Sequence, residues 1–423
     1  MQRDIIRRGD IASQSDTAFT VDRLTDPEVI RNPYPYYDLL RDRSPLFGYR
    51  DYPPGTMPGV DEPKPAWVVL NFDDVAAVAW DNDAFSSRDS LQEGSSAPTL
   101  MLVNHDKPEH TRLRKIAAAV FRPSAIRGLA PEIDRLAVAT MDEFFVPGCE
   151  VDVMADYCAM LPSRVMTLLF GMPVEMDRDV RNWATAFMLS ADIDPAERQA
   201  FNAEAMVFFD RHVRQQIRRI EAGERPPGAL LNAFIETVIE GDRLSFDEVV
   251  RFCMTATVAG AETTSFYLGN LFAVLADFPD VWAAFVADAG RFDAIYKETL
   301  RFHGPPQRLF RVATRDVTIG RADIKRGDWV ACFFGAANYD PAVFEDPYSF
   351  KLDRENAARH MSFGYGIHRC LGAPLAHLEA ESTALALRDR YAQIERVGDA
   401  EWQSVSLLNH GLARNPMIFH TRE

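Results

Sequence analysis

The longest run of apolar and polar positions with helical spacing predicts a single helix over residues 245–278. It opens with Ser245-Phe246-Asp247-Glu248, a capping box in which a serine and a glutamate satisfy the free amides of a helix N-terminus. The run VVRFCMTATVAGAETTSFYLGNLFAVLADF follows, and Pro279 ends it. At about 1.5 Å per residue this helix is roughly 50 Å long, enough to cross the whole molecule.

Most of the remaining chain is helical in pattern, with a smaller β component. Strand-like runs are expected at 66–70, 316–319 and 329–333. The predicted fold class is therefore α+β, mainly α with smaller β-sheets.

Two stretches rich in proline and glycine, 52–65 and 222–228, interrupt the pattern. Neither resembles a long flexible linker, so residues 1–423 are expected to form one domain. The β-richer portions of that domain are expected at about 45–75 and 305–335.

Composition narrows the class of protein. The 423 residues are 47% hydrophobic and carry a net charge of −16, which argues against general binding to nucleic acid or to anionic membranes. The polar start MQRDIIRRGDIASQSD has no signal-peptide core, and no apolar run is long enough to span a bilayer. We expect a cytoplasmic protein without a membrane anchor. No coiled-coil pattern suggests assembly, so a monomer is expected.

The number and spacing of the five cysteines argue against disulfides, and one of the five lies in an unusual sequence context. They are odd in number, scattered, and contain no Cys-x-x-Cys pair, so a disulfide framework or a cysteine zinc site is not expected. Cys370 differs from the others because it follows the glycine-hinged stretch Phe363-Gly364-Tyr365-Gly366-Ile367-His368-Arg369. A helix expected at 371–387 would place its N-terminal amides beside the sulfur and favour a thiolate.

A thiolate held in this way is a candidate axial ligand for haem iron. Phe363 would cover the sulfur, and His368 could donate to an anionic group of the ligand. The alternatives are a small buried hydrophobic cysteine and an ordinary glycine turn. A phosphate-binding loop is disfavoured, because no strand precedes it and no Gly-Lys-Ser/Thr follows.

The joint pattern F-G-x-G-x-H-x-C-x-G, which ends at Gly372, resembles the proximal haem loop of the cytochrome P-450 family of haem-thiolate monooxygenases. The resemblance extends from Asn32-Pro33-Tyr34 to the C-terminal turn. It implies haem b between the long helix and the cysteine loop, with Cys370 as the iron ligand and Gly364, Gly366 and Gly372 close to the cofactor. It also implies the soluble bacterial type of enzyme.

The segment Ala259-Gly260-Ala261-Glu262-Thr263-Thr264 lies within the long predicted helix. Read alone, it is a helix interior with a patch of small residues. It is similar to the family's acid–alcohol motif, which implies that Thr263 hydrogen-bonds iron-bound dioxygen and that Glu262 delivers protons. Ala259 and Gly260 would then lie next to the haem, where glycine permits close approach to the helix backbone.

The sequence Glu298-Thr299-Leu300-Arg301 places two opposite charges on one helix face. Such pairs are common on surfaces and contribute little there. The resemblance implies a different role, in which Glu298 and Arg301 join Arg354 in a buried network that supports the cysteine loop. Tyr339 stands where the family often has arginine.

A further group of basic residues is expected around the haem propionates. His110 and Arg114 are four residues apart, so they share a helix face, which could also be a solvated basic face. The resemblance implies that the propionates are bound by His110, Arg114, Arg311 and His368.

The expected substrate pocket is apolar, which favours a small or medium hydrophobic substrate. Its expected lining, carried over from the family, is Leu100, Val103, Phe187, Met188, Val258, Ala259, Leu309 and Leu407. Gln307 and Asn409 are candidate anchors for one polar group of the substrate.

Three functions remain open from the sequence. The favoured one is a monooxygenase that hydroxylates or epoxidises its substrate with electrons from a separate ferredoxin or flavodoxin. The others are an enzyme of the same fold that performs oxidative coupling, desaturation or ring closure, and a haem-binding sensor without turnover. Basic residues at Arg112, Lys115, Arg122 and Arg369 are expected to steer an acidic electron donor.

Overall fold

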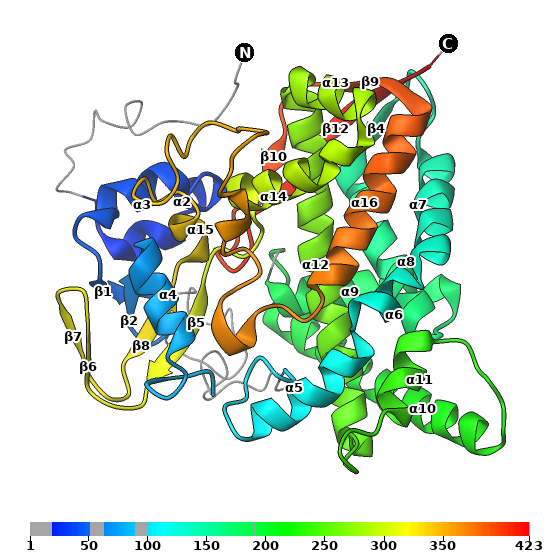
Figure 1. Cartoon of the computed structure of the whole chain (residues 1–423), viewed down its shortest axis with the longest axis horizontal. Coiled ribbons are helices and arrows are strands. Elements are labelled where there is room, and N and C mark those ends of the chain that lie inside the picture. The colour runs from blue at the N-terminus through cyan, green and yellow to red at the C-terminus, as the bar shows by residue number, and fades with distance from the viewer. Residues whose placement is uncertain (1–18, 51–62, 89–99, 190, 423) are drawn as a thin grey trace.

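The computed structural model describes residues 19–50, 63–88, 100–189 and 191–422. The chain has a β-containing side, built mostly from its N-terminal part and residues 309–337, and a larger helical side (Figure 1). The α+β fold class predicted from the sequence is confirmed. The predicted loop 52–65 falls almost entirely outside the described residues.

The helices of eight or more residues are α3 (Tyr34–Arg41), α4 (Phe72–Trp80), α5 (Glu109–Val120), α7 (Ala130–Phe144), α8 (Met160–Phe170), α9 (Asp177–Met188), α10 (Pro195–Glu221), α11 (Ala229–Glu236), α12 (Phe246–Asp277), α13 (Pro279–Ala287), α14 (Phe292–His303) and α16 (Ala373–Arg390). The shorter ones are α2 (Pro27–Arg31), α6 (Pro123–Arg127), α15 (Phe334–Ala337) and the single turns η1 (Val21–Thr25), η2 (Met154–Cys158), η3 (Val174–Met176), η4 (Ala289–Arg291), η5 (Ala357–Arg359) and η6 (Gly366–His368).

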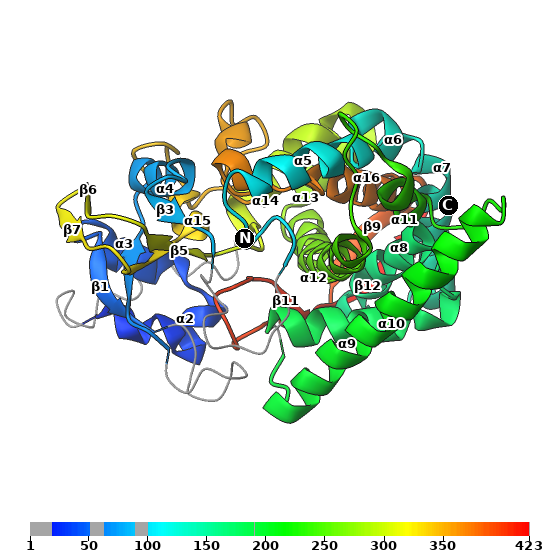
Figure 2. The ribbon, with the colours of Figure 1, turned by 90° about the horizontal axis from the view of Figure 1, so that it is seen from below.

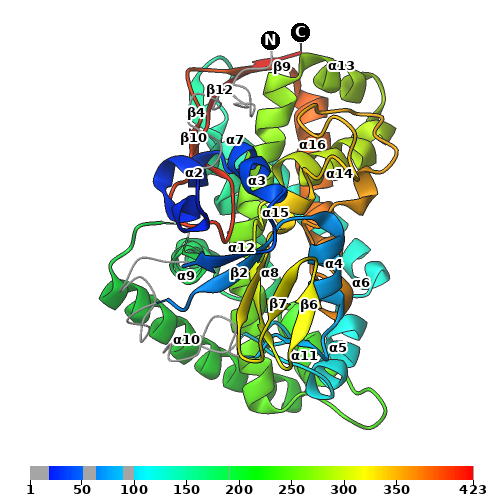
Figure 3. The same cartoon turned by 90° about the vertical axis from the view of Figure 1, so that its left-hand side faces the viewer.

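The main sheet has five strands in the order β1-β2-β8-β5-β3, with β2 and β8 parallel and the other pairs antiparallel. Its strands are β1 (Leu46–Tyr49), β2 (Ala66–Val69), β3 (Phe85–Ser86), β5 (Leu309–Ala313) and β8 (Trp329–Cys332). The smaller sheets contain β4 (Glu150–Asp152), β6 (Val317–Ile319), β7 (Ala322–Ile324), β9 (Tyr391–Arg396), β10 (Glu401–Trp402), β11 (Leu412–Arg414) and β12 (Pro416–Thr421). The β6–β7 hairpin lies at the left edge of the β side in Figure 1 and faces the viewer in Figure 3.

Helix α12 is the central element of the molecule. Both halves of its predicted capping box form, with the Ser245 hydroxyl and the Glu248 carboxylate each accepting a backbone amide. Its 32 residues span about 48 Å, and neighbouring helices surround it when it is viewed end-on in Figure 2. Most of its side chains are buried, which fits its apolar composition on all faces.

Predicted local boundaries mostly agree with the structure. Strands β2, β6 and β8 begin within one residue of the predicted runs, and the predicted break at 222–228 separates α10 from α11. Within the described parts of the chain, no helix is by itself long and apolar enough to cross a membrane. Only α12 and α13 together reach that criterion, and a 97° bend separates them.

Candidate active site

One cavity of about 220 Å³ collects the chemically distinctive residues. Its wall is formed by α12, α5, strand β5, the cysteine loop and the start of α16. Cys370, Thr263 and Arg311 all line it, although more than a hundred residues separate Thr263 from Cys370 in sequence.

The cysteine loop owes its shape to two glycines. Gly364 and Gly366 have φ values of +71° and +70°, which residues with a side chain rarely adopt. A Cβ atom on Gly366 would also lie 2.7 Å from the carbonyl oxygen of Ala79, at the end of α4. The Cys370 amide closes the loop by donating to the Phe363 carbonyl at 2.8 Å. The loop therefore presents both Phe363 and Cys370 to the cavity.

The Cys370 sulfur lies in a mixed electrostatic environment. Burial raises the pKa of the Cys370 thiol, while the amides of Gly372 and Ala373 and the guanidinium of Arg114 oppose that shift. Helix α16 begins at Ala373, so the expected amide donors at its N-terminus are present. Burial outweighs them, and a coordinating cation would therefore be needed to hold the sulfur as a thiolate.

Four basic side chains lie together on the cavity wall: His110, Arg114, Arg311 and His368. The His110 and His368 rings are 4.6 Å apart, and His368 Nε2 is 3.0 Å from the Ser87 hydroxyl. The Arg311 guanidinium donates a hydrogen bond to the Phe310 carbonyl at 2.7 Å.

Within the described part of the chain, the arginines of this basic cluster are not balanced by ion pairs. Among the described residues, no carboxylate lies within ion-pair distance of Arg114 or Arg311, and His110 Nε2 is buried without a hydrogen-bond partner. Burial lowers the pKa of both arginines and, with Arg114 adding to the effect, lowers the pKa of His110 to about 4. A buried and a half-buried guanidinium without ion-pair partners fit a ligand that brings its own carboxylates, as the propionates of a haem would.

Helix α12 contributes Ala259, Gly260, Thr263 and Thr264 to the same wall. The Thr263 hydroxyl donates to the Ala259 carbonyl at 2.6 Å, the back-bond that a mid-helix threonine commonly makes. Gly260 is constrained from another side as well, because a Cβ there would lie 3.1 Å from the Met166 methyl carbon on α8. The absence of a side chain at Gly260 thus leaves room both in the cavity and for the packing of α8 against α12.

Glu262 points away from this wall. Its Oε2 accepts a hydrogen bond from the Thr185 hydroxyl of α9 at 3.1 Å, and only 9% of the residue is exposed. Among the described residues it does not line the cavity. The acid and the alcohol of the sequence motif therefore face different elements, which the sequence did not reveal because Thr185 lies far away along the chain.

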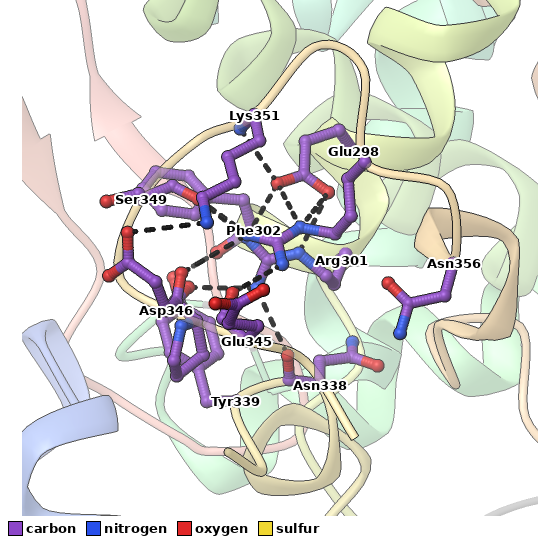
Figure 4. A network of polar contacts seen from close by, with 12 residues as sticks. Glu298, Arg301, Phe302, Asn338, Tyr339, Glu345, Asp346, Ser349, Lys351 and Asn356 are labelled. Atoms are coloured by element: carbon purple, nitrogen blue, oxygen red, sulfur yellow. Dashed lines mark hydrogen bonds and ion pairs between the residues drawn. The ribbon is translucent and has the colours of Figure 1, made fainter. Parts of the chain in front are cut away.

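The charges of Glu298, Arg301 and Arg354 form one buried network. Figure 4 shows Glu298 and Arg301 at its centre. Glu298 accepts two hydrogen bonds from Arg301, each 2.8 Å, and two from Arg354 Nε at 2.9 and 3.1 Å. The Lys351 amide adds a fifth at 3.1 Å. The remaining guanidinium hydrogens reach backbone carbonyls, including those of Asn338 and Ser349, so both charges are satisfied.

The network reaches the cysteine loop through two residues that sequence reasoning missed. The Asn338 carbonyl accepts from Arg301, while its side chain accepts from the Met361 amide at 2.7 Å and donates to the Ser362 hydroxyl at 2.9 Å. Ser362 donates in turn to the Leu300 carbonyl at 2.6 Å. Helix α14 and the start of the cysteine loop are thereby held together. In the sequence, the one indication of a role for Asn338 is that it precedes Tyr339, the position at which the family often has arginine.

Tyr339, which replaces the family's frequent arginine, is fully buried. Its hydroxyl donates to the Phe302 carbonyl at 2.7 Å, and its ring stacks on Tyr34 with centroids 4.1 Å apart. The departure is accommodated by an aromatic stack beside the Arg301 guanidinium.

The predicted substrate residues do not all gather at the cavity. Val103, Ala259 and Leu309 line it, whereas Leu100, Phe187 and Met188 do not. Val258 and Leu407 are buried within hydrophobic core clusters and do not line this cavity. Sequence reasoning missed the apolar wall residues Phe121, Met166, Leu230, Phe234 and Phe252.

The two proposed polar anchors lie away from the cavity. Gln307 donates to the Gly304 carbonyl at 2.8 Å and accepts from the Tyr37 hydroxyl, so it ties α3 to the end of α14. Asn409 is also buried; its backbone carbonyl accepts from Gln403, and its side-chain nitrogen has no hydrogen-bond partner among the described residues. Neither lines the cavity among the described residues.

Two of the four predicted docking cations are already paired. Arg112 binds Asp242 at 2.6 Å and Glu248 at 2.5 Å, and Lys115 binds Glu240 at 3.0 Å. These contacts fasten α5 to the segment that leads into α12. Arg122 and Arg369 are exposed, and no ion pair to either is recorded in the described part of the chain.

Comparison with known proteins agrees with this geometry. The sequence model of the Cytochrome P450 family matches residues 292–387, which contain Glu298, Arg301 and Cys370. The chain is 32% identical over 410 residues to cytochrome P450 140 of Mycobacterium tuberculosis, covering 93% of this chain and 89% of that protein.

Solved structures give the same result. Cytochrome P450 CYP109Q5 from Chondromyces apiculatus superposes with a TM-score of 0.80 and 29% identity, covering 94% of this chain and 98% of the other. CYP109E1 from Bacillus megaterium, solved in complex with testosterone, has a TM-score of 0.78 and 26% identity, covering 92% and 98%. With its cysteine loop, buried charge network and central helix in this arrangement, the chain belongs to the cytochrome P450 family of monooxygenases.

Proposed function

We propose that the chain binds haem b through the Cys370 thiolate and uses dioxygen to hydroxylate or epoxidise a small or medium hydrophobic molecule. The observation that carries this proposal is the single cavity shared by Cys370, Thr263, Arg114 and Arg311. These side chains come from four separate segments of the chain. An ordinary apolar void would not collect a thiol, an alcohol, a buried guanidinium and a half-buried one.

The residues that would hold the haem divide by their chemistry. Cys370 would ligate the iron, and His110, Arg114, Arg311 and His368 would bind the propionates. When bound, the haem supplies the electron-transfer and dioxygen chemistry, and its thiolate ligand favours cleavage of the O–O bond. Phe363 would keep water from the sulfur, and Gly364, Gly366 and Gly372 would let the loop backbone approach the haem closely.

Thr263 is the proposed alcohol of the proton pathway. Its hydroxyl donates to Ala259, so its lone pairs can accept a hydrogen bond from water in the cavity. Release of the Ala259 carbonyl would let the same hydroxyl donate towards dioxygen. We assign Thr263 to orienting dioxygen and to passing protons to it.

Glu262 is the proposed acid that feeds this pathway from the α9 side. Neighbouring residues on a helix point about 100° apart, so Glu262 and Thr263 leave α12 in different directions. A proton leaving the carboxyl group near Thr185 would therefore reach the cavity through water.

The apolar wall residues Val103, Ala259 and Leu309 support a hydrophobic substrate. The relative CYP109E1 was solved with testosterone, which agrees with an apolar substrate class for this chain.

Electrons would come from a separate ferredoxin or flavodoxin, because no nicotinamide or flavin fingerprint follows a strand in this sequence. With Arg112 and Lys115 paired to carboxylates, Arg122 and Arg369 are the stronger candidates for docking cations. Arg122→Glu should slow reduction by a plant-type ferredoxin at low ionic strength. An unchanged rate would remove Arg122 from the docking surface.

The carbon monoxide difference spectrum of the reduced protein tests the cofactor assignment. A strongly red-shifted Soret band is expected for the wild type and is expected to be lost in Cys370→Ser, because the alkoxide or alcohol does not replace a thiolate electronically. A band at the ordinary position in the active wild-type protein would contradict the assignment of Cys370.

Replacement of Thr263 tests the oxygen chemistry. Thr263→Ala should release peroxide in place of oxygenated product, because the proton is then misdirected, whereas Thr263→Ser should retain most of the coupling. The ratio of product to electrons consumed is the measurement. Full coupling in Thr263→Ala would contradict the role given to this hydroxyl.

A further inference from the structure

A second cavity, of about 970 Å³, lies away from the candidate active site. Its wall is formed by α2, the start of α3, the C-terminal ends of α12 and α14, and strands β9 and β10. Among the described residues, no member of its lining also lines the cavity that contains Cys370. Its volume falls within the range of roughly 300–1,000 Å³ that is typical of sites for small organic molecules.

Four aromatic side chains of this lining contact one another: Tyr34, His303, Trp402 and His410. The Trp402 and His410 rings are stacked, with centroids 4.4 Å apart and planes inclined by 9°. The His303 ring lies 5.1 Å from Trp402 on another side. Trp402 is partly exposed, whereas the other three are buried. Its indole is therefore the accessible aromatic surface of the cluster, on which a planar ring can stack.

Helix α12 holds the aromatic cluster in place. The Asn270 side-chain nitrogen donates to the His303 carbonyl at 2.7 Å and to the His410 carbonyl at 3.4 Å. The His410 amide donates to the Pro305 carbonyl at 2.6 Å. Both histidines are thus fixed by backbone contacts, so a ligand would meet a surface that is already formed.

The two histidines differ in how their ring nitrogens are satisfied. His410 contacts the Tyr34 hydroxyl at 3.3 Å and the Arg31 carbonyl at 3.0 Å. His303 is only 8% exposed, yet its Nδ1 is buried without a hydrogen-bond partner in the described part of the chain. Burial lowers the pKa of His303 well below its usual value, so its ring is neutral, with one N–H donor and one acceptor nitrogen. A buried nitrogen without a partner is unfavourable, and a polar group of a ligand would relieve it.

The charged residues of the lining lie on its solvent side. Arg396 binds Asp277 through two hydrogen bonds, at 2.8 and 2.9 Å, which neutralises both. The remaining charges are Arg31, Glu395 and Asp399, all exposed. With these charges of both signs outside and uncharged aromatic groups inside, the inner end suits a neutral ring better than an ion.

We propose that this cavity is a second small-molecule site, which binds a neutral planar aromatic compound of the phenol class. Its ring would stack on Trp402, and its hydroxyl would form a hydrogen bond with His303 Nδ1. A hydroxyl both donates and accepts, so it matches either tautomer of the histidine. An internal water would satisfy the nitrogen but would leave the indole surface and most of the 970 Å³ without a ligand. The site is independent of the proposed monooxygenase function, because none of its residues takes part in that chemistry.

Isothermal titration calorimetry of the haem-loaded protein with 2-naphthol tests the site. The wild type should bind one molecule of 2-naphthol that leaves the Soret band unchanged, whereas a molecule beside the haem would shift that band. Trp402→Leu should weaken the Soret-silent binding about tenfold. Trp80→Leu is the matched control and should leave it unchanged, because Trp80 is 65% exposed and, among the described residues, lines neither cavity. Absence of Soret-silent binding, or equal affinity in wild type and Trp402→Leu, would overturn the proposal.

Naphthalene, which has the same rings without the hydroxyl, isolates the contribution of His303. The preference of the wild type for 2-naphthol over naphthalene should fall about tenfold in His303→Phe, the equivalent of ~1.4 kcal/mol. An equal preference in both proteins would show that His303 does not hold the hydroxyl and would overturn the assigned ligand class. The Trp402→Leu test decides the site by itself if His303→Phe does not fold. Neither test measures turnover, so their failure is distinct from failure of the enzymatic proposal.

Discussion

Glu298 and Glu379 are both fully buried glutamates on helices beside the cysteine loop, yet their surroundings are opposite. Glu298 receives five hydrogen bonds from two arginines and a backbone amide. Glu379 has neither a hydrogen bond to Oε2 nor an ion pair within the described structure. The same residue type is thus part of a complete network in one place and lacks such partners in the other.

The contrast extends to the arginines. Arg301 distributes its donors among Glu298 and three backbone carbonyls, whereas Arg114 has no anionic partner in the described part of the chain. Burying an unpaired charge is costly, so a folded chain retains one chiefly where a ligand completes it. On the cavity wall, Arg114 and His110 lack such partners within the described part of the chain, whereas the supporting network around Arg301 is complete.

The largest expected effect comes from opening the complete network. Glu298→Gln should lower the free energy of unfolding by about 3–5 kcal/mol, because it leaves Arg301 and Arg354 buried without their counter-charge. Chemical denaturation measures this change. Asp293→Asn is the matched control on α14, since its exposed pair with Lys297 is worth less than about 1 kcal/mol. Equal effects of both substitutions would contradict the comparison.

The next effect concerns His410, a buried histidine in which both ring nitrogens have a hydrogen-bond partner. Its ring nitrogens contact the Tyr34 hydroxyl at 3.3 Å and the Arg31 carbonyl at 3.0 Å, and burial lowers its pKa to about 4 against the opposing effect of that carbonyl. The unfolded histidine takes up a proton near pH ~6.5, so stability is full above that pH and is lost as the pH falls towards 4.

His410 should contribute about 3 kcal/mol to the loss over this interval, measured by urea unfolding across the pH series. Other histidines add to the loss, because burial also lowers the pKa of His110 and His360 to about 4. His410→Gln should make that part of the profile shallower by its own share. His420→Gln should not, because His420 is exposed and pairs with Glu395 at the surface. Parallel profiles for wild type and His410→Gln would assign the acid sensitivity to other groups.

The smallest expected effect separates two arginines on one helix. Arg114→Leu should weaken haem retention but raise the stability of the haem-free protein by about 1 kcal/mol, because it removes an unpaired, partly buried charge. Arg112→Leu should do the reverse, lowering stability by about 1–3 kcal/mol through loss of Asp242 and Glu248 while leaving haem retention unchanged.

Haem transfer to apomyoglobin and denaturation of the haem-free form measure the two properties. If Arg114→Leu destabilised the haem-free protein as much as Arg112→Leu does, Arg114 would be part of the structural network and the distinction drawn here would be wrong.

Local features of the fold were accessible from the sequence because their causes are local. The capping box at Ser245 and the stop at Pro279 fix α12, and the glycines at 364 and 366 permit the turn that presents Cys370. The spacing of Glu298 and Arg301 places both on one face of α14. Helix periodicity, turn geometry and caps act over a few residues, so the order of residues specifies them.

The partners of each side chain were decided only by the tertiary structure. Glu262 binds Thr185 on α9, Arg112 binds carboxylates 130 and 136 residues away, and Gln307 is taken up by Tyr37. Val258 lies in the core although its neighbour Ala259 lines the cavity. The sequence alone determined which residues could carry the chemistry. The fold decided which of them remained without partners. The partner of a buried charge comes from a distant segment of the chain, which lies beside it only in the folded protein.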